Sequence, residues 1–141
     1  MNEFTFSQLD VGHKEEFTVQ ITKEMEDAFR QITGDVNPLH QDDAFAVQTG
    51  GGRFRSHVSF GMLTASFYST LAGVYLPGKY SLIHSLSIKF QKPVFAGDTL
   101  TVVGEIIDKQ DELKLIQIKA VIKNQRAQSV SKADMKVLVM K

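Results

Sequence analysis

The chain has 141 residues, of which 43% are hydrophobic and 23% charged, and this fits one globular domain over residues 1–141 with a sizeable core. Lysine plus arginine equals aspartate plus glutamate at 16 each, so we expect neither nucleic acid nor a membrane surface as a partner. The absence of cysteine excludes disulfide frameworks, cysteine-based zinc sites and thiol nucleophiles. The first residues lack the pattern of a signal peptide, so we expect a cytoplasmic protein.

The first half of the chain predicts one strand and three helices. Apolar residues alternate with polar ones near 17–21, as in a half-buried strand. The helical patterns indicate a helix from its N-cap Thr22 to Gly34, a short helix capped by Asn37 that carries Leu39, His40 and Ala44 through Val47, and a longer helix from Gly61 to about Tyr75. The run 58–78 has no formal charge, but its serines, threonines, glycines and proline favour a buried helix over a membrane span.

The second half predicts four antiparallel strands joined by polar turns. The alternation of apolar and polar residues places them near 82–90, 99–107, 113–123 and 129–140. His84 falls on the apolar side of the first of these strands, so we expect it to be a hydrogen-bonded core residue. This order of elements indicates an α+β fold, with an antiparallel sheet wrapped around the one helix that is apolar on most of its surface.

The segment Thr33–His40 carries the most concentrated polar chemistry of the chain. Asp35 and His40 stand five residues apart across an Asn-Pro turn, and a carboxylate and an imidazole that converge can act as a base and an acid on the same substrate. The plainer interpretation is that Asp35 binds turn amides and that His40 faces solvent, because these residue types are common in turns. Asn37 would cap its own short helix or orient His40.

A second candidate element is the start of the long helix. The Gly61 N–H would be one of the unpaired donors there, and a donor backed by the helix dipole suits a developing oxyanion. The alternative is close packing of Gly61 against a strand. Ser69, two turns further along, would offer a hydroxyl to the same pocket or bond back to its own helix.

Several motifs resemble those of one known family. The stretch Phe29–His40, with Ala46 six residues later, is similar to the hydratase motif of the MaoC-like (R)-specific enoyl-CoA hydratases. The likeness extends through Gly61–Leu63, Leu76–Lys79 and Lys92–Asp98. This resemblance implies a hot-dog fold, in which the sheet wraps around a central helix, and a homodimer or higher homo-oligomer.

The resemblance also implies a reaction and a set of site residues. The reaction is (R)-specific hydration of trans-2-enoyl-CoA to (R)-3-hydroxyacyl-CoA, and its reverse, in fatty acid metabolism. Asp35 and His40 match the catalytic pair, and Gly61 matches the glycine whose N–H binds the thioester oxygen. Substrate contacts are expected from Asn37, Phe60, Met62 and Ser69. No metal and no cofactor are expected, apart from the coenzyme A carried by the substrate.

The sequence departs from the family pattern at Phe60, because members commonly carry histidine before this glycine. His57 lies three residues earlier and is not assumed to replace it. The departure leaves alternatives open: a dehydratase acting on another 3-hydroxyacyl thioester, on coenzyme A or acyl carrier protein, a hot-dog thioesterase, or a non-catalytic acyl-CoA-binding module. Acyl chain length and pathway stay open too.

Overall fold

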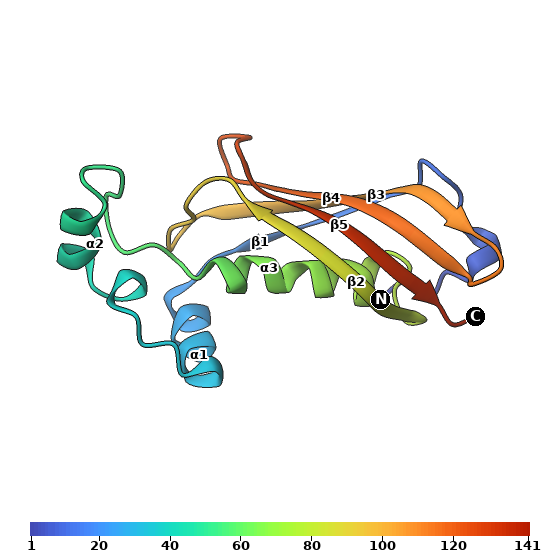
Figure 1. Ribbon diagram of the computed structural model, residues 1–141, viewed down its shortest axis with the longest axis horizontal. Coiled ribbons are helices and arrows are strands. Elements are labelled where there is room, and N and C mark those ends of the chain that lie inside the picture. Colours follow the sequence, from blue (N-terminus) through green and yellow to red (C-terminus); the bar gives the residue numbers. More distant parts are fainter.

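Five antiparallel strands form one sheet in the computed structural model, which describes residues 1–141 (Figure 1). In chain order they are β1 (Lys14–Gln20), β2 (Ser81–Phe90), β3 (Thr99–Gln110), β4 (Leu115–Lys123) and β5 (Ser129–Val139). Their order in the sheet is β1-β3-β4-β5-β2, and each neighbouring pair is antiparallel. The last three strands are therefore consecutive hairpins, while β1 and β2 form the two edges.

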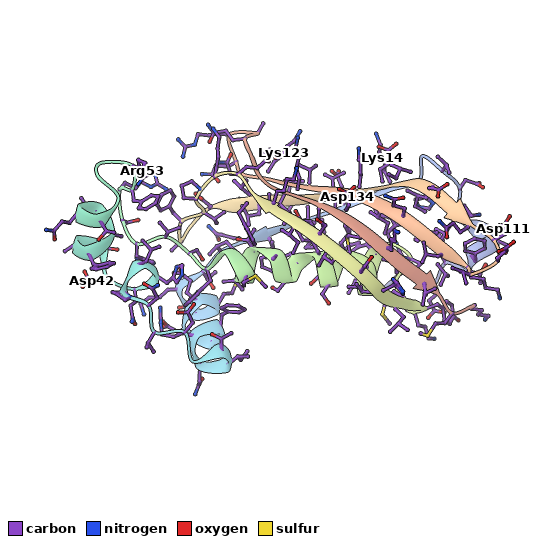
Figure 2. The ribbon with its side chains drawn as sticks, in the orientation of Figure 1. Lys14, Asp42, Arg53, Asp111, Lys123 and Asp134 are labelled. Carbon is purple, nitrogen blue, oxygen red and sulfur yellow. The ribbon has the colours of Figure 1, made fainter.

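The helices divide between the sheet and a projecting segment. They are η1 (Phe6–Gln8), α1 (Lys23–Thr33), η2 (Pro38–His40), α2 (Asp43–Thr49) and α3 (Gly61–Thr70), which continues as the π-helical turn η3 (Leu71–Tyr75). Figure 1 shows α3 lying along one face of the sheet, whereas α1 and α2 lie beyond one end of it. Lys14 and Lys123 point away from α3, on the opposite face (Figure 2).

The core lies between α3 with its π turn and the sheet. Tyr68, Leu71 and Ala72 are fully buried there, against the inward positions of the long strands. The Tyr68 hydroxyl donates to Ser131 Oγ of β5 at 2.8 Å, and burial raises the pKa of this tyrosine to about 12. Gly104 of β3 admits the helix closely, because a Cβ at this position would lie 2.7 Å from Leu71 Cδ2.

The structure confirms the expected α+β architecture, with differences at two helices. The helix expected to continue from His40 into Ala44 is broken into η2 and α2, because Asp42 begins a new helix by accepting the Phe45 N–H at 3.0 Å. The long helix changes to a π turn after Thr70. The charge-free run nevertheless forms a helix with a buried face, and no helix of the structure has the length and apolarity to cross a membrane.

The expectation that His84 belongs to the core is wrong. Its side chain is exposed, and the pairing of β2 with β5 shifts register between Ile83 and Ser85, directly around it. Alternation within the strand did not predict burial, because β2 is an edge strand whose apolar side chains remain accessible to solvent. Leu82, Leu86 and Phe90 are 53%, 38% and 54% exposed.

Replacing Tyr68 by phenylalanine tests the buried link between α3 and β5. We expect Tyr68→Phe to lower the free energy of unfolding by about 1 to 2 kcal/mol, because Ser131 loses a hydrogen-bond donor in a fully buried site. Urea denaturation measures the change. Tyr80→Phe is the matched control, since its hydroxyl meets only the exposed Lys141 amine, and we expect an effect within about 0.5 kcal/mol. Equal effects at both tyrosines would contradict the assignment.

Candidate active site

The turn after α1 is built by local hydrogen bonds. Gly34 ends the helix in the left-handed conformation, with φ at +71°, and its N–H donates to the Arg30 carbonyl at 2.8 Å. Asp35 Oδ1 then accepts the Asn37 N–H at 3.1 Å, and Asn37 Oδ1 accepts the Leu39 N–H at 3.0 Å. Asn37 is thus the cap of η2, as its sequence context predicts. Asp35 does bind a turn amide, and its side chain lies in an exposed segment.

The ring of His40 is held in one defined state. Its Nδ1 lies 2.8 Å from the Val58 carbonyl oxygen. Because a carbonyl can only accept, Nδ1 must carry the hydrogen, and the neutral ring then keeps a free lone pair on Nε2. The backbone is fixed as well, since Val58 N–H donates to the Leu39 carbonyl at 3.0 Å and Arg30 Nη2 donates to the His40 carbonyl at 3.2 Å.

Phe60 forms an apolar wall behind this imidazole. Its side chain is 2% exposed, and its ring centroid lies 4.4 Å from that of His40 and 5.1 Å from that of Phe29. The Arg30 guanidinium lies 5.6 Å from the Phe60 centroid, within cation–π distance. The Phe60 ring therefore supports the His40 ring by packing.

A cavity of about 310 Å³ joins His40 to the start of α3. Gly61 lines it, and the N–H groups of Gly61 and Met62 donate to no backbone carbonyl, while Phe60 provides no side-chain cap. A Cβ at Gly61 would lie 3.2 Å from the Phe90 ring, so a larger residue here would press on a side chain that lines the same cavity. The wall includes apolar side chains such as Phe54, Phe90 and Val94. The arrangement can bind an oxyanion beside a general base.

The expected site residues are only partly brought together. His40 and Gly61 line the same cavity, and Phe60 lies directly behind it. Four others lie outside its lining: Asp35, Asn37, Met62 and Ser69. Asp35 and Asn37 belong to the exposed turn, and Met62 and Ser69 are exposed on α3.

One cluster was missed by the sequence reasoning. His57 Nδ1 lies 2.6 Å from Asp43 Oδ1, and His57 Nε2 lies 3.1 Å from Glu26 Oε1. Partial burial opposes charge on this imidazole, but its hydrogen bonds to Asp43 and Glu26 and their negative charges outweigh that effect and raise the pKa of His57. The hydrogen bonds from the backbone and ring of His57 lower the pKa of Asp43. No periodic pattern relates these three positions, so only the fold reveals the cluster.

The three elements that carry this cluster are distant in sequence. Glu26 is 98% buried on α1, Asp43 opens α2, and His57 lies on the loop before α3. Figure 2 places the neighbouring Asp42 and Arg53 on the projecting segment beyond the end of the sheet. The cluster therefore joins the projecting helices to the loop that leads into the cavity.

Comparisons with known proteins agree with this architecture. A sequence model described as a MaoC like domain matches residues 7–130. The chain is 40% identical over 98 residues to a protein named (R)-specific enoyl-CoA hydratase from Aeromonas caviae, across 70% of this chain and 71% of that one. It is 33% identical over 113 residues to a protein named 3-hydroxybutyryl-CoA dehydratase from Methylorubrum extorquens, across 78% and 70% of the two chains.

Solved structures extend the likeness to the fold. The unliganded R-hydratase PhaJ1 from Pseudomonas aeruginosa matches with a TM-score of 0.90, over 99% of this chain and 87% of that one, at 27% identity. The expectation of a hot-dog fold is thereby confirmed.

Truncating Phe60 tests the apolar wall behind His40. We expect Phe60→Ala to lower the free energy of unfolding by about 3 to 5 kcal/mol, because a fully buried aromatic ring leaves a cavity. Thermal or urea denaturation measures the loss. Phe45→Ala is the control, since Phe45 is 39% exposed on α2, and we expect it to cost about 1 kcal/mol. A change at Phe60 no larger than the change at Phe45 would contradict the packing role.

Proposed function

Since the chain belongs to the MaoC-like domain family, we propose that it hydrates trans-2-enoyl-CoA to (R)-3-hydroxyacyl-CoA and catalyses the reverse dehydration, with His40 as general base and the Gly61 N–H as oxyanion donor. The chain is an enzyme of the hydro-lyase type with a hydratase or dehydratase role, like its relatives named hydratase and dehydratase.

One observation carries the proposal. The cavity that His40 lines is the same cavity that reaches the uncapped N-terminus of α3 at Gly61. An enoyl thioester needs both partners at once, because its carbonyl oxygen gains negative charge while water adds two carbons away. A base without the donor, or a donor without the base, would not accelerate this addition.

The proposed mechanism gives a separate role to Gly61, His40 and Asp35. The Gly61 N–H binds the thioester oxygen, which makes Cβ electrophilic. The neutral Nε2 of His40 accepts one proton from water as the water oxygen bonds to Cβ, and Asp35 accepts a hydrogen bond from the second proton. His40 then delivers its proton to Cα from the same side, so the addition is syn. Dehydration follows these steps in reverse.

Asp35 is assigned to this step because it matches the family motif; in the structure its carboxylate accepts the Asn37 N–H and does not line the cavity. Its carboxylate has to turn from the Asn37 amide toward the cavity when substrate is bound, a tightening that is common at catalytic hydrogen bonds. Asn37, Phe60, Met62 and Ser69 are proposed to act by shaping or lining the approach of the acyl thioester.

Crotonyl-CoA hydration tests the proposal. We expect purified protein to remove the enoyl-thioester absorbance without releasing free thiol and to form the (R) product. Asp35→Asn and His40→Gln should each lower kcat/KM by at least about 100-fold while the fold is retained, because each removes a proton-handling group.

The remaining outcomes are diagnostic. Thiol release would favour a thioesterase, and acyl-CoA binding without turnover would favour a binding module. Activity confined to acyl-carrier-protein substrates would keep the chemistry and change the carrier. Near-normal turnover by either variant would refute the assigned mechanism.

We also propose that the protein is a homodimer joined through β2. This edge strand is 10 residues long and exposes Leu82 and Leu86, and Met62 on the adjoining α3 is 60% exposed. An unpaired apolar edge of this length favours pairing with another copy.

The oligomeric state in solution tests this proposal. Light scattering should give twice the chain mass of 15.7 kDa, or a higher multiple, and Leu82→Asp combined with Leu86→Asp should shift the protein toward the monomer mass. Leu113→Asp is the control, because Leu113 is 62% exposed in the turn before β4 and should leave the mass unchanged. A wild-type monomer at high concentration would contradict the proposal.

A further inference from the structure

The Glu26–His57–Asp43 cluster makes contacts that no step of the proposed reaction uses. His57 is bound twice by Asp43, whose Oδ1 accepts both its backbone N–H at 2.9 Å and its ring Nδ1–H at 2.6 Å. Its Nε2 meets Glu26 Oε1 at 3.1 Å, and the Glu26 carboxylate is 2% exposed. A buried carboxylate without a positive partner is strongly unfavourable, so moving His57 away from Glu26 would cost much free energy.

The cluster is one residue away from the group that orients His40. Val58, which follows His57, accepts His40 Nδ1–H with its carbonyl and donates its N–H to the Leu39 carbonyl. Ser59 N–H in turn donates to the Val94 carbonyl, next to the sheet. A shift of His57 would therefore move the carbonyl that fixes the tautomer of His40.

We propose that His57, bridging Glu26 and Asp43, is a positioning residue that holds the Val58 carbonyl against His40 and so keeps the catalytic Nε2 free. This proposal rests on the hydratase function of the same site. It assigns His57 no contact with substrate.

The bridge needs a charged imidazole. Ionised carboxylates only accept hydrogen bonds, so with both Glu26 and Asp43 ionised, both ring nitrogens carry hydrogen when both contacts form. The raised pKa of His57 agrees with this requirement. The stabilisation is complete below the ordinary value of 6.5 and is lost as the pH rises through the raised value, so the activity should decline on the alkaline side.

The other charged groups near the bridge have their own partners. On α1, Lys23 and Arg30 both pair with Asp27 at 2.9 Å. Arg30 also donates to the His40 carbonyl, and Arg55, on the loop of His57, lies 3.7 Å from Asp98. Glu26 and Asp43 are therefore the two charged groups that contact His57.

Two substitutions separate positioning from simple structural support. His57→Gln replaces two separate donor nitrogens with one uncharged amide nitrogen, and we expect kcat for enoyl-CoA hydration to fall by about 10- to 100-fold with KM changed less than about threefold. Glu26→Gln is the informative partner, because its amide can donate to the lone pair of a neutral imidazole. That variant should keep most of the neutral-pH activity and lose the alkaline decline.

The test measures kcat from pH 6 to pH 10, and thermal unfolding, for the wild type, His57→Gln, Glu26→Gln and His40→Gln. His13→Gln is the matched control. His13 directly precedes β1 and pairs with Glu15 of that strand at 3.0 Å, so we expect this variant to leave the pH profile unchanged. The inference would be overturned if kcat of Glu26→Gln still declined at alkaline pH, or if His57→Gln were folded and had the wild-type kcat. Full activity in His40→Gln would instead overturn the proposed function.

A second measurement does not depend on activity. Nitrogen-15 histidine spectra of His57→Gln should show His40 losing its single Nδ1–H tautomer, whereas His13→Gln should retain it. An unchanged His40 tautomer in His57→Gln would refute the positioning role even if no substrate is turned over.

Discussion

The hydrogen bond from His40 Nδ1 to the Val58 carbonyl joins the two halves of the proposed active site. One half is the turn that follows α1, and the other is the loop that enters α3 and reaches Gly61. A backbone carbonyl is a suitable partner because it has no alternative protonation state and can only accept. The single contact therefore fixes the orientation of the ring and the location of its free lone pair, which together decide whether the imidazole can serve as a base.

The surroundings of this hydrogen bond are mostly apolar. Phe60 packs against the His40 ring, and the cavity beyond it is bordered by Phe54, Phe90 and Val94. An acyl thioester that fills this cavity would displace water from the Gly61 N–H, so the hydrogen bond to its oxygen would be stronger than in solvent. Phe60 is thus compatible with the proposed hydratase mechanism, in which the oxyanion donor is a backbone group and the base is His40.

Local chemistry made much of the fold predictable. Thr22, Gly34 and Asn37 have the expected capping roles, because caps depend on residues within one turn. Alternation located the strands near their observed ranges. His84 and β2 were misjudged, since exposure depends on what covers an edge strand, which alternation does not encode.

The site was predictable to a lesser extent. The motif resemblance pointed to His40 and Gly61, which the fold brings to one cavity. The Glu26–His57 contact joins residues 31 positions apart and has no periodic signature, so it emerged only from the structure. The role proposed for Asp35 rests on the motif, because its carboxylate accepts the Asn37 N–H and lies outside the cavity lining.

The tautomer of His40 in the wild-type protein tests this account most directly. Nitrogen-15 labelled histidine, assigned by comparison with His40→Gln, reports which ring nitrogen carries the hydrogen at a pH where the ring is neutral. The account predicts hydrogen on Nδ1 and an unprotonated Nε2. Hydrogen on Nε2, or rapid exchange between both forms, would contradict it, because the base would then be missing from the cavity that Gly61 shares.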